Sequence, residues 1–280
     1  MAESVPYWIT SDFFEKALKY DGKHSDKKII SFDIKRTGAA GDHYSSEIYR
    51  ATVTTTENGK TEEISIIVKC KRQQGQISKI TEGNDIFKTE AKTLANIHIP
   101  INKLLEKAFR GSYQPIAAKC IYTQDVPTAI VLEDLKKQGF TLATVTHGLD
   151  LKHCLHVLRN IAQYHACSVV VRQQEPSSFK TFLDYYFENK EYSGMNAYFQ
   201  NTVKSVKREA EKWSGYEKCV DSLTALESET FGRWINSVLR QEDGYNVLIH
   251  GDLWLNNIMF RYSDENDVQE VRYVTSNILY

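Results

Sequence analysis

The chain has 280 residues, of which 41% are hydrophobic and 25% are charged, and it contains only 5 prolines and 14 glycines. This composition is that of a globular protein with one large domain or two lobes, and it excludes a largely disordered chain. The formal net charge of -1 excludes a global positive field that would attract nucleic acid or an anionic membrane. Five scattered cysteines without a C-x-x-C pair predict reduced thiols and no zinc site.

The first residues, Met1–Phe14, contain Glu3 and Asp12 and have no long apolar core, so we expect no signal peptide. Nowhere does the sequence have 18 consecutive apolar residues, so we also expect no membrane span. These features predict a cytoplasmic protein with no nucleic-acid or membrane partner. The sequence leaves the oligomeric state undetermined.

The first half of the chain alternates one short helix with strands. Ser11 is the expected N-cap of a helix over 12–18, and Glu57–Lys60 (ENGK) is a hairpin turn signal. A 3.6-residue apolar period predicts a second helix over 85–98. Runs rich in β-branched residues predict strands over 29–35, 46–54, 63–71, 117–122 and 129–132.

The second half is mainly helical. The stripe that begins Leu151, Leu155, Leu158 predicts a buried helix over 151–170. Further helices are expected over 179–187, 195–213 and 216–238, and short strands over 246–249, 258–260 and 271–274. The change of texture predicts an α+β fold with two lobes, over 1–132 and 133–280.

Two glycines lie in the turn from Gly38 to Ser46 (GAAGDHYSS), between two predicted strands. Because glycine has no Cβ, such a turn can bring backbone N–H groups close to phosphate oxygens. An ordinary hairpin has the same pattern, so Gly38 and Gly41 are only candidate phosphate contacts.

Lys69 ends a strand of β-branched residues, and Glu90 follows 21 residues later on the predicted helix. A lysine anchored on a strand below a glycine turn can neutralise a phosphate, and a glutamate can hold its ammonium group in place. A solvent-facing strand lysine and a surface helical glutamate are the alternative reading of these two residues.

The stretch HGDLWLNN places His250, Asp252 and Asn257 in the spacing H-x-D-x-x-x-x-N. This is the spacing of the catalytic loop of kinases, in which the aspartate orients or accepts the proton of the acceptor hydroxyl and the asparagine binds magnesium. Phosphoryl transfer requires these groups because a carboxylate must face the nucleophile and oxygen ligands must hold the cation. A metallophosphoesterase would need further His and Asp clusters that the sequence lacks.

Four segments together resemble the ecdysteroid kinase-like family of arthropod small-molecule kinases, which has a protein-kinase-like fold. They are GAAGDHYSSEIY at 38–49, IVLEDL at 130–135, IAQYHACS at 161–168 and VLIHGDLWLNNIMF at 247–260. The resemblance implies an ATP- and Mg²⁺-dependent kinase that phosphorylates a hydroxyl of a small molecule, such as an ecdysteroid or another lipophilic alcohol.

The resemblance also implies that the lobe over 1–132 binds nucleotide, that the lobe over 133–280 is catalytic, and that individual residues have defined roles. The turn that contains Gly38, Gly41, Ser45 and Ser46 would cover the ATP phosphates, Lys69 would contact them, and Glu90 would pair with Lys69. The segment from Glu133 to Leu135 would be the hinge that offers backbone groups to adenine. Asp252 would be the catalytic carboxylate, Asn257 a magnesium ligand, and His250 a residue that braces the loop.

The resemblance breaks after Val274, where the family continues with Asp-Phe-Gln and this chain has Thr275 instead of the second magnesium-binding aspartate. We therefore expect a C-terminally truncated member, from an isoform or a gene-model error, whose activity is in doubt. A non-catalytic, pseudokinase-like module that binds nucleotide remains the alternative function.

Overall fold

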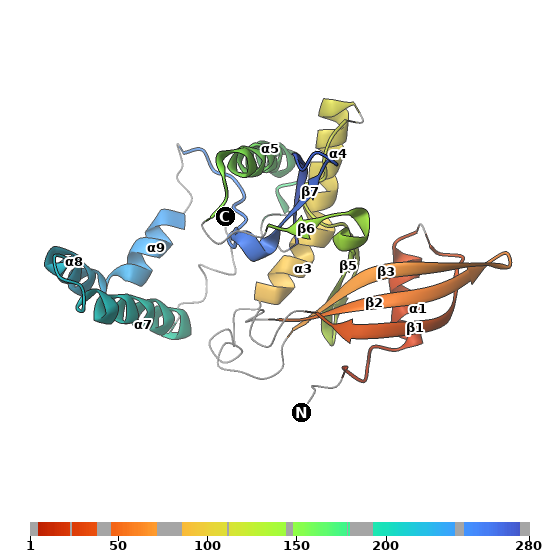
Figure 1. Ribbon diagram of the computed structural model, residues 1–280, viewed down its shortest axis with the longest axis horizontal. Coiled ribbons are helices and arrows are strands. Elements are labelled where there is room, and N and C mark those ends of the chain that lie inside the picture. The colour runs from red at the N-terminus through yellow and green to blue at the C-terminus, as the bar shows by residue number, and fades with distance from the viewer. Residues whose placement is uncertain are drawn as a thin grey trace.

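A computed structural model of the chain describes residues 5–22, 24–37, 46–71, 86–110, 112–143, 148–177, 179, 193–238 and 244–274. The fold is α+β, as predicted, with an antiparallel sheet in the first half and mainly helices in the second (Figure 1). The predicted turn at Gly38–Ser45, the helix over 180–187 and Thr275 lie outside the described residues.

Five antiparallel strands form the sheet of the first half, in the order β1-β2-β3-β5-β4. Asn58 and Gly59 have positive φ angles of 49° and 78° and join β2 to β3, which confirms the predicted hairpin turn. The strand β3 therefore lies at the centre of the sheet. The strands span β1 Lys28–Arg36, β2 Ser46–Glu57, β3 Lys60–Lys71, β4 Cys120–Asp125 and β5 Thr128–Glu133.

The helix α1, Ser11–Tyr20, covers one face of this sheet. Its N-cap is Thr10, whose extended backbone lets Oγ1 accept a hydrogen bond of 3.4 Å from the N–H of Phe13. The prediction of Ser11 as N-cap was therefore wrong by one residue, because both residue types can cap and only backbone geometry decides between them. Phe13 and Phe14 are buried against the sheet.

The predicted helix over 85–98 is two helices, α3 (Ile86–Asn96) and α4 (His98–Phe109), and α4 was not predicted. Pro100 obscures α4 in the sequence, yet it is tolerated there because the first turn of a helix needs no N–H at this position. The helix α4 ends at Arg110, which is in the left-handed conformation.

The second half contains four helices and a small sheet of order β6-β7-β8 among the described residues. The helix predicted over 216–238 is divided into α8 and α9. The elements are η1 Leu135–Gln138, β6 Thr141–Leu142, α5 Leu151–Gln174, α7 Ser193–Ala210, α8 Glu217–Leu226, α9 Thr230–Val238, η2 Leu255–Asn257, β7 Ile258–Tyr262 and β8 Val268–Tyr273.

The residues before HGDLWLNN do not form the predicted strand over 246–249. The N–H of Leu248 instead donates to the hydroxyl of Ser168 on α5, at 3.0 Å, so a side chain takes the place of a neighbouring strand. The hairpin β7–β8 that follows is formed as the apolar runs predicted.

The apolar stripe of α5 is not its buried face. Leu151 and Leu158 are exposed, whereas Val157, Tyr164 and Val171 are buried. Asn160 and Ser168 lie on the buried face too, and these polar residues hide its period from a hydrophobicity pattern. The prediction of a helix was correct, and the prediction of its buried side was wrong.

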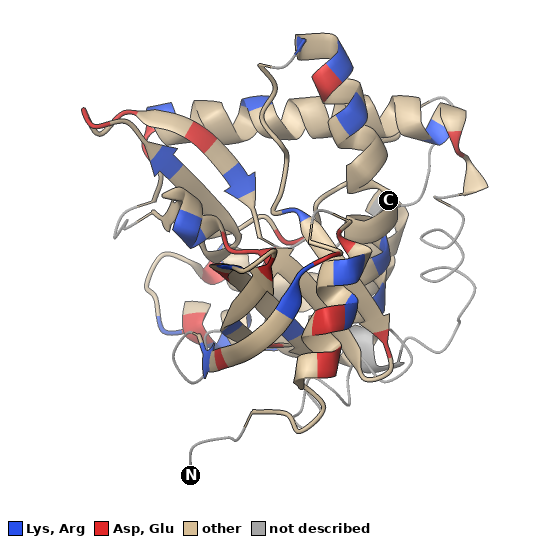
Figure 2. Cartoon of the chain, turned by 90° about the vertical axis from the view of Figure 1, so that its right-hand side faces the viewer, with Lys and Arg blue, Asp and Glu red and all other residues tan. Residues whose placement is uncertain are grey.

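The two sheets are joined by main-chain hydrogen bonds before β4. The N–H of Ala118 donates to the C=O of Tyr273 at 2.9 Å, and the N–H of Tyr273 donates to the C=O of Ile116 at 3.1 Å. The helices α7, α8 and α9 lie to one side of both sheets (Figure 1). None of the helices in the described part of the chain has the length and apolar character that a membrane crossing needs. Acidic and basic residues alternate along the elements seen in Figure 2.

Candidate active site

Lys69 and Glu90 form a buried ion pair. The ammonium nitrogen lies 2.7 Å from each carboxylate oxygen, and the two residues are only 5% and 1% exposed. The ring of Phe87 lies 5.7 Å from the same nitrogen. Two charges at this depth are stable only together, because either one alone would lose its hydration without compensation. The predicted partnership of Lys69 with Glu90 therefore has the expected geometry.

Strand alternation explains why Lys69 faces away from α1. Val68 and Cys70 pack in the cluster that contains α1, so the residue between them points to the opposite face. There α3 brings Phe87 and Ala91 against the sheet, and Glu90 lies on the same helix.

The loop that carries HGDLWLNN is held by its own hydrogen bonds. The Nδ1 atom of His250 accepts a bond of 3.3 Å from the N–H of Asp252, so this nitrogen carries no proton. Gly251 between them has a φ of 75°, a conformation that disfavours residues with a Cβ. His250 therefore contacts the main chain of the loop, and its bracing role stays a prediction.

Asn257 returns to Asp252 at the end of this loop. Its Nδ2 atom donates to the main-chain oxygen and to the Oδ2 atom of Asp252, both at 2.8 Å. With the amide nitrogen turned to the carboxylate, the amide oxygen of Asn257 is the group available for a cation. The structure thus brings together the two residues to which the sequence assigns the catalytic and the metal-binding roles.

Below the loop lie aromatic residues that the motif search did not identify. The ring of Tyr273 lies edge-on to His250, with centroids 5.1 Å apart, and its hydroxyl donates to the C=O of Val157 at 3.2 Å. His98 is buried at the start of α4, with Tyr164 at 5.8 Å. Burial, and after it the proximity of His250, lowers the pKa of His98 to about 3. Isolated His and Tyr residues give no local sequence signal for such a contact.

One apolar cluster connects the lysine pair with the loop. Ile67, two residues before Lys69, packs in the cluster that also contains Met259, two residues after Asn257. Val274 packs there too, and its N–H donates to the C=O of Asn257 at 3.1 Å. The two parts of the candidate site therefore border the same cluster.

The remaining predicted site residues are placed only in part. Ser46 is buried at the start of β2, whereas Gly38, Gly41 and Ser45 lie outside the described residues. Leu135 is buried in the apolar cluster described above. The side chain of Glu133 is engaged by Arg272 on β8, and its main-chain N–H donates to the C=O of Lys119.

The donor set fits a magnesium ion that is shared with phosphate. Among the described residues no group of three or more His, Cys, Asp or Glu side chains could hold a metal alone. Asp252 and Asn257 supply a carboxylate and an amide oxygen, and Mg²⁺ is commonly bound by one or two such ligands together with substrate phosphates and water.

The fold and this arrangement define the class of kinase-like phosphotransferases. The model of the ecdysteroid kinase-like family matches residues 40–274. The chain belongs to that family. Comparisons with curated proteins and with solved structures found no match.

Proposed function

We propose that the protein transfers the γ-phosphoryl group of ATP to a hydroxyl group of a small molecule. The observation that carries this proposal is the buried pair of Lys69 and Glu90 beside the same apolar cluster as the Asp252–Asn257 loop. A fixed ammonium group and an oxygen-rich loop are the parts that phosphoryl transfer requires. Membership of the ecdysteroid kinase-like family supports the same reaction class.

Each residue has a role in this proposal. Lys69 contacts a phosphate oxygen of ATP, and Glu90 keeps its ammonium group in place. The amide oxygen of Asn257 would hold Mg²⁺, and the ion would offset the negative charge of the phosphates. His250 keeps the loop in the conformation that presents Asp252.

The transfer itself is a displacement at phosphorus. The hydroxyl oxygen of the acceptor attacks the γ-phosphorus while its proton passes to the carboxylate of Asp252. The bond between the γ-phosphorus and the oxygen that bridges to the β-phosphate breaks, and ADP leaves with that electron pair. Lipophilic alcohols, ecdysteroids among them, are the first acceptors to test because the family has that name.

ADP release in a panel of hydroxylated sterols and lipophilic alcohols tests the reaction. We expect Mg·ATP-dependent release with at least one acceptor, and we expect Asp252→Asn to lower it by about 100-fold or more, because a positioned base contributes on the order of 10²–10⁴-fold. The matched control is Asp264→Asn, which changes an exposed aspartate in the turn between β7 and β8. Equal turnover by the Asp252 and Asp264 variants would contradict the role of Asp252.

A non-catalytic, nucleotide-binding module is the second candidate. Thr275 favours it, because this residue stands where the resemblance places the second magnesium-binding aspartate. Binding of Mg·ATP without ADP release in the whole panel would support this candidate, and turnover that Asp252→Asn abolishes would eliminate it.

A further inference from the structure

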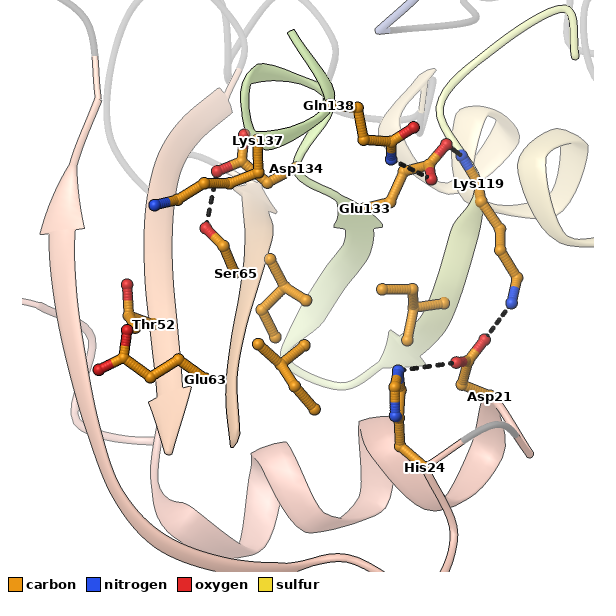
Figure 3. Close-up of a pocket in the computed structure, with 13 residues that line it drawn as sticks. Asp21, His24, Thr52, Glu63, Ser65, Lys119, Glu133, Asp134, Lys137 and Gln138 are labelled. Carbon is orange, nitrogen blue, oxygen red and sulfur yellow. Dashed lines mark hydrogen bonds and ion pairs between the residues drawn. The ribbon is translucent and has the colours of Figure 1, made fainter. Parts of the chain in front are cut away.

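At the end of β5 the side chains of two neighbouring acidic residues, Glu133 and Asp134, point in opposite directions. Asp134 faces the five-stranded sheet, where its Oδ2 atom accepts from Arg50 on β2 at 2.8 Å and from Ser65 on β3 at 2.7 Å. Burial acts to raise the pKa of Asp134, but the hydrogen bonds from Arg50 and Ser65 outweigh it and hold that pKa below the usual value. Figure 3 shows Asp134 directed to Ser65.

Glu133 is directed away from that sheet and joins two segments that are distant in sequence. Its Oε1 atom accepts from Arg272 on β8 at 3.0 Å and from the N–H of Lys119, just before β4, at 2.8 Å. Its Oε2 atom accepts from Gln138 at 2.7 Å, as Figure 3 also shows. The carboxylate of Glu133 thus binds Lys119 just before β4, Gln138 in the segment after β5, and Arg272 in the small sheet.

Arg272 is the second member of a row of alternating charges, Glu133, Arg272, Glu270 and Arg261. Glu270 is 3% exposed and accepts from Arg272 at 2.8 and 2.9 Å and also from Arg261. Both guanidinium groups lie over the ring of buried Phe140, at 4.9 and 5.4 Å from its centroid. Hydrogen bonds between ionised groups are stronger than neutral ones, and partial burial protects them from water and salt.

One side of this part of the chain borders open space. Glu133, Asp134, Lys137 and Gln138 line a cavity of about 330 Å³ whose apolar wall includes Ile64, Ile66 and Ile121 (Figure 3). A segment that borders empty space has fewer side-chain contacts to restrain it. Leu135 packs on the other side of this segment, and the polar contacts of the two acids add to that packing and to the main-chain hydrogen bonds between residues 116–118 and Tyr273.

The ion pair between Glu133 and Arg272 is adjacent in sequence to residues that contact the candidate active site. Arg272 is followed by Tyr273, which contacts His250, and by Val274, which is bonded to Asn257. Ser65, the partner of Asp134, precedes Lys69 by four residues on β3. A displacement of β8 relative to β3 would change the spacing between Lys69 and Asp252.

We infer that the ion pair between Glu133 and Arg272 fixes the spacing of the two sheets and thereby positions Lys69 relative to Asp252. In this scheme the side chains of Glu133 and Arg272 are positioning groups that touch neither ATP nor acceptor, and any adenine contact of Glu133 is made by its main chain. The part that concerns catalysis rests on the proposed function, whereas the part that concerns sheet spacing does not.

Distance measurements between two spin labels test the spacing. The labels are placed at exposed Lys60, in the β2–β3 hairpin, and at exposed Lys152, on α5, in a background in which the exposed Cys219 is replaced by serine. We expect a narrow distance distribution in the wild type and a broader one in Arg272→Met and Glu133→Gln. The control Arg233→Met removes an exposed arginine on α9 that pairs with Glu229 just before that helix, and it should leave the distribution unchanged. Unchanged distance distributions in both Arg272→Met and Glu133→Gln would overturn the inference.

Kinetics with Mg·ATP and an accepted alcohol test the positioning role. We expect Arg272→Met to lower kcat by about 10- to 100-fold with a KM for ATP within threefold of the wild type, because small misplacements of reacting groups cost up to about 10²-fold. The double variant with Glu133→Gln should be no worse than the poorer single variant, and Arg272→Lys should recover part of kcat. Additive losses, or loss of stability with unchanged kcat, would overturn the role. Broadened distances in a wild type that lacks turnover would support the spacing and contradict the proposed function.

Discussion

At the scale of single residues, the site depends on the buried charges of Lys69 and Glu90 and on the half-buried carboxylate of Asp252. Lys69 and Glu90 satisfy each other at 2.7 Å, and Asp252 takes two hydrogen bonds from Asn257 through its side-chain and main-chain oxygens. Both pairs were identified from sequence spacing, because the chemistry of phosphate fixes which residue types must occur together. Arg272 and His98 were not predicted to contribute to the site, because their partners are distant in sequence and no motif contains them.

His98 gives the protein a defined response to acid. Its folded-state pKa of about 3 lies below the ordinary value of 6.5, so unfolded chains bind its proton first as the pH falls. The free energy of unfolding should therefore decrease by about 1.4 kcal/mol per pH unit from this group between about pH 6.5 and pH 3. Chemical denaturation of the wild type and of His98→Asn measures the difference. The variant should have a shallower pH dependence in that window, and parallel curves would contradict the buried neutral histidine.

At the scale of elements, local patterns located most helices and strands but not always the sides they bury. The strands β1 to β3 and their hairpin follow from β-branched runs and the Asn58-Gly59 turn. The helix α5 exposes its leucines because Tyr164 and Ser168 make the buried contacts. Which face is covered depends on tertiary neighbours, and a single hydrophobic period carries no information about them.

Substitutions on the two sides of α5 test this orientation. Leu158 is 61% exposed and Val171 is 1% exposed. We expect Leu158→Gln to change the free energy of unfolding by less than about 0.5 kcal/mol. Val171→Ala should cost about 1–3 kcal/mol, because it removes buried methyl groups and leaves a cavity. Urea denaturation measures the free energy of unfolding of both variants. A larger loss for Leu158→Gln than for Val171→Ala would mean that the leucine stripe of α5 is buried and would contradict this orientation.

At the scale of the whole molecule, two sheets meet around one apolar cluster, and each contributes half of the candidate site. The five-stranded sheet carries Lys69, and the small sheet follows the loop with Asp252 and Asn257. The α+β fold was expected from the change of texture along the chain, whereas the division into lobes of 1–132 and 133–280 stays a prediction. The contacts that Glu133 makes between the two sheets were not predicted, because the family resemblance assigns this segment only to adenine binding.

Calorimetric titration of Mg·ATP tests the central claim most directly, namely that the buried lysine forms a phosphate site. Removing Lys69 alone would leave Glu90 buried without a partner, at a cost of about 3–5 kcal/mol. The variant should therefore be Lys69→Met with Glu90→Gln, and its control Lys152→Met with Asp267→Asn, an exposed ion pair. We predict that the wild type and the control bind Mg·ATP with equal affinity and that the folded Lys69 variant binds at least about tenfold more weakly. Equal affinity in all three proteins, or no binding by the wild type, would contradict the account.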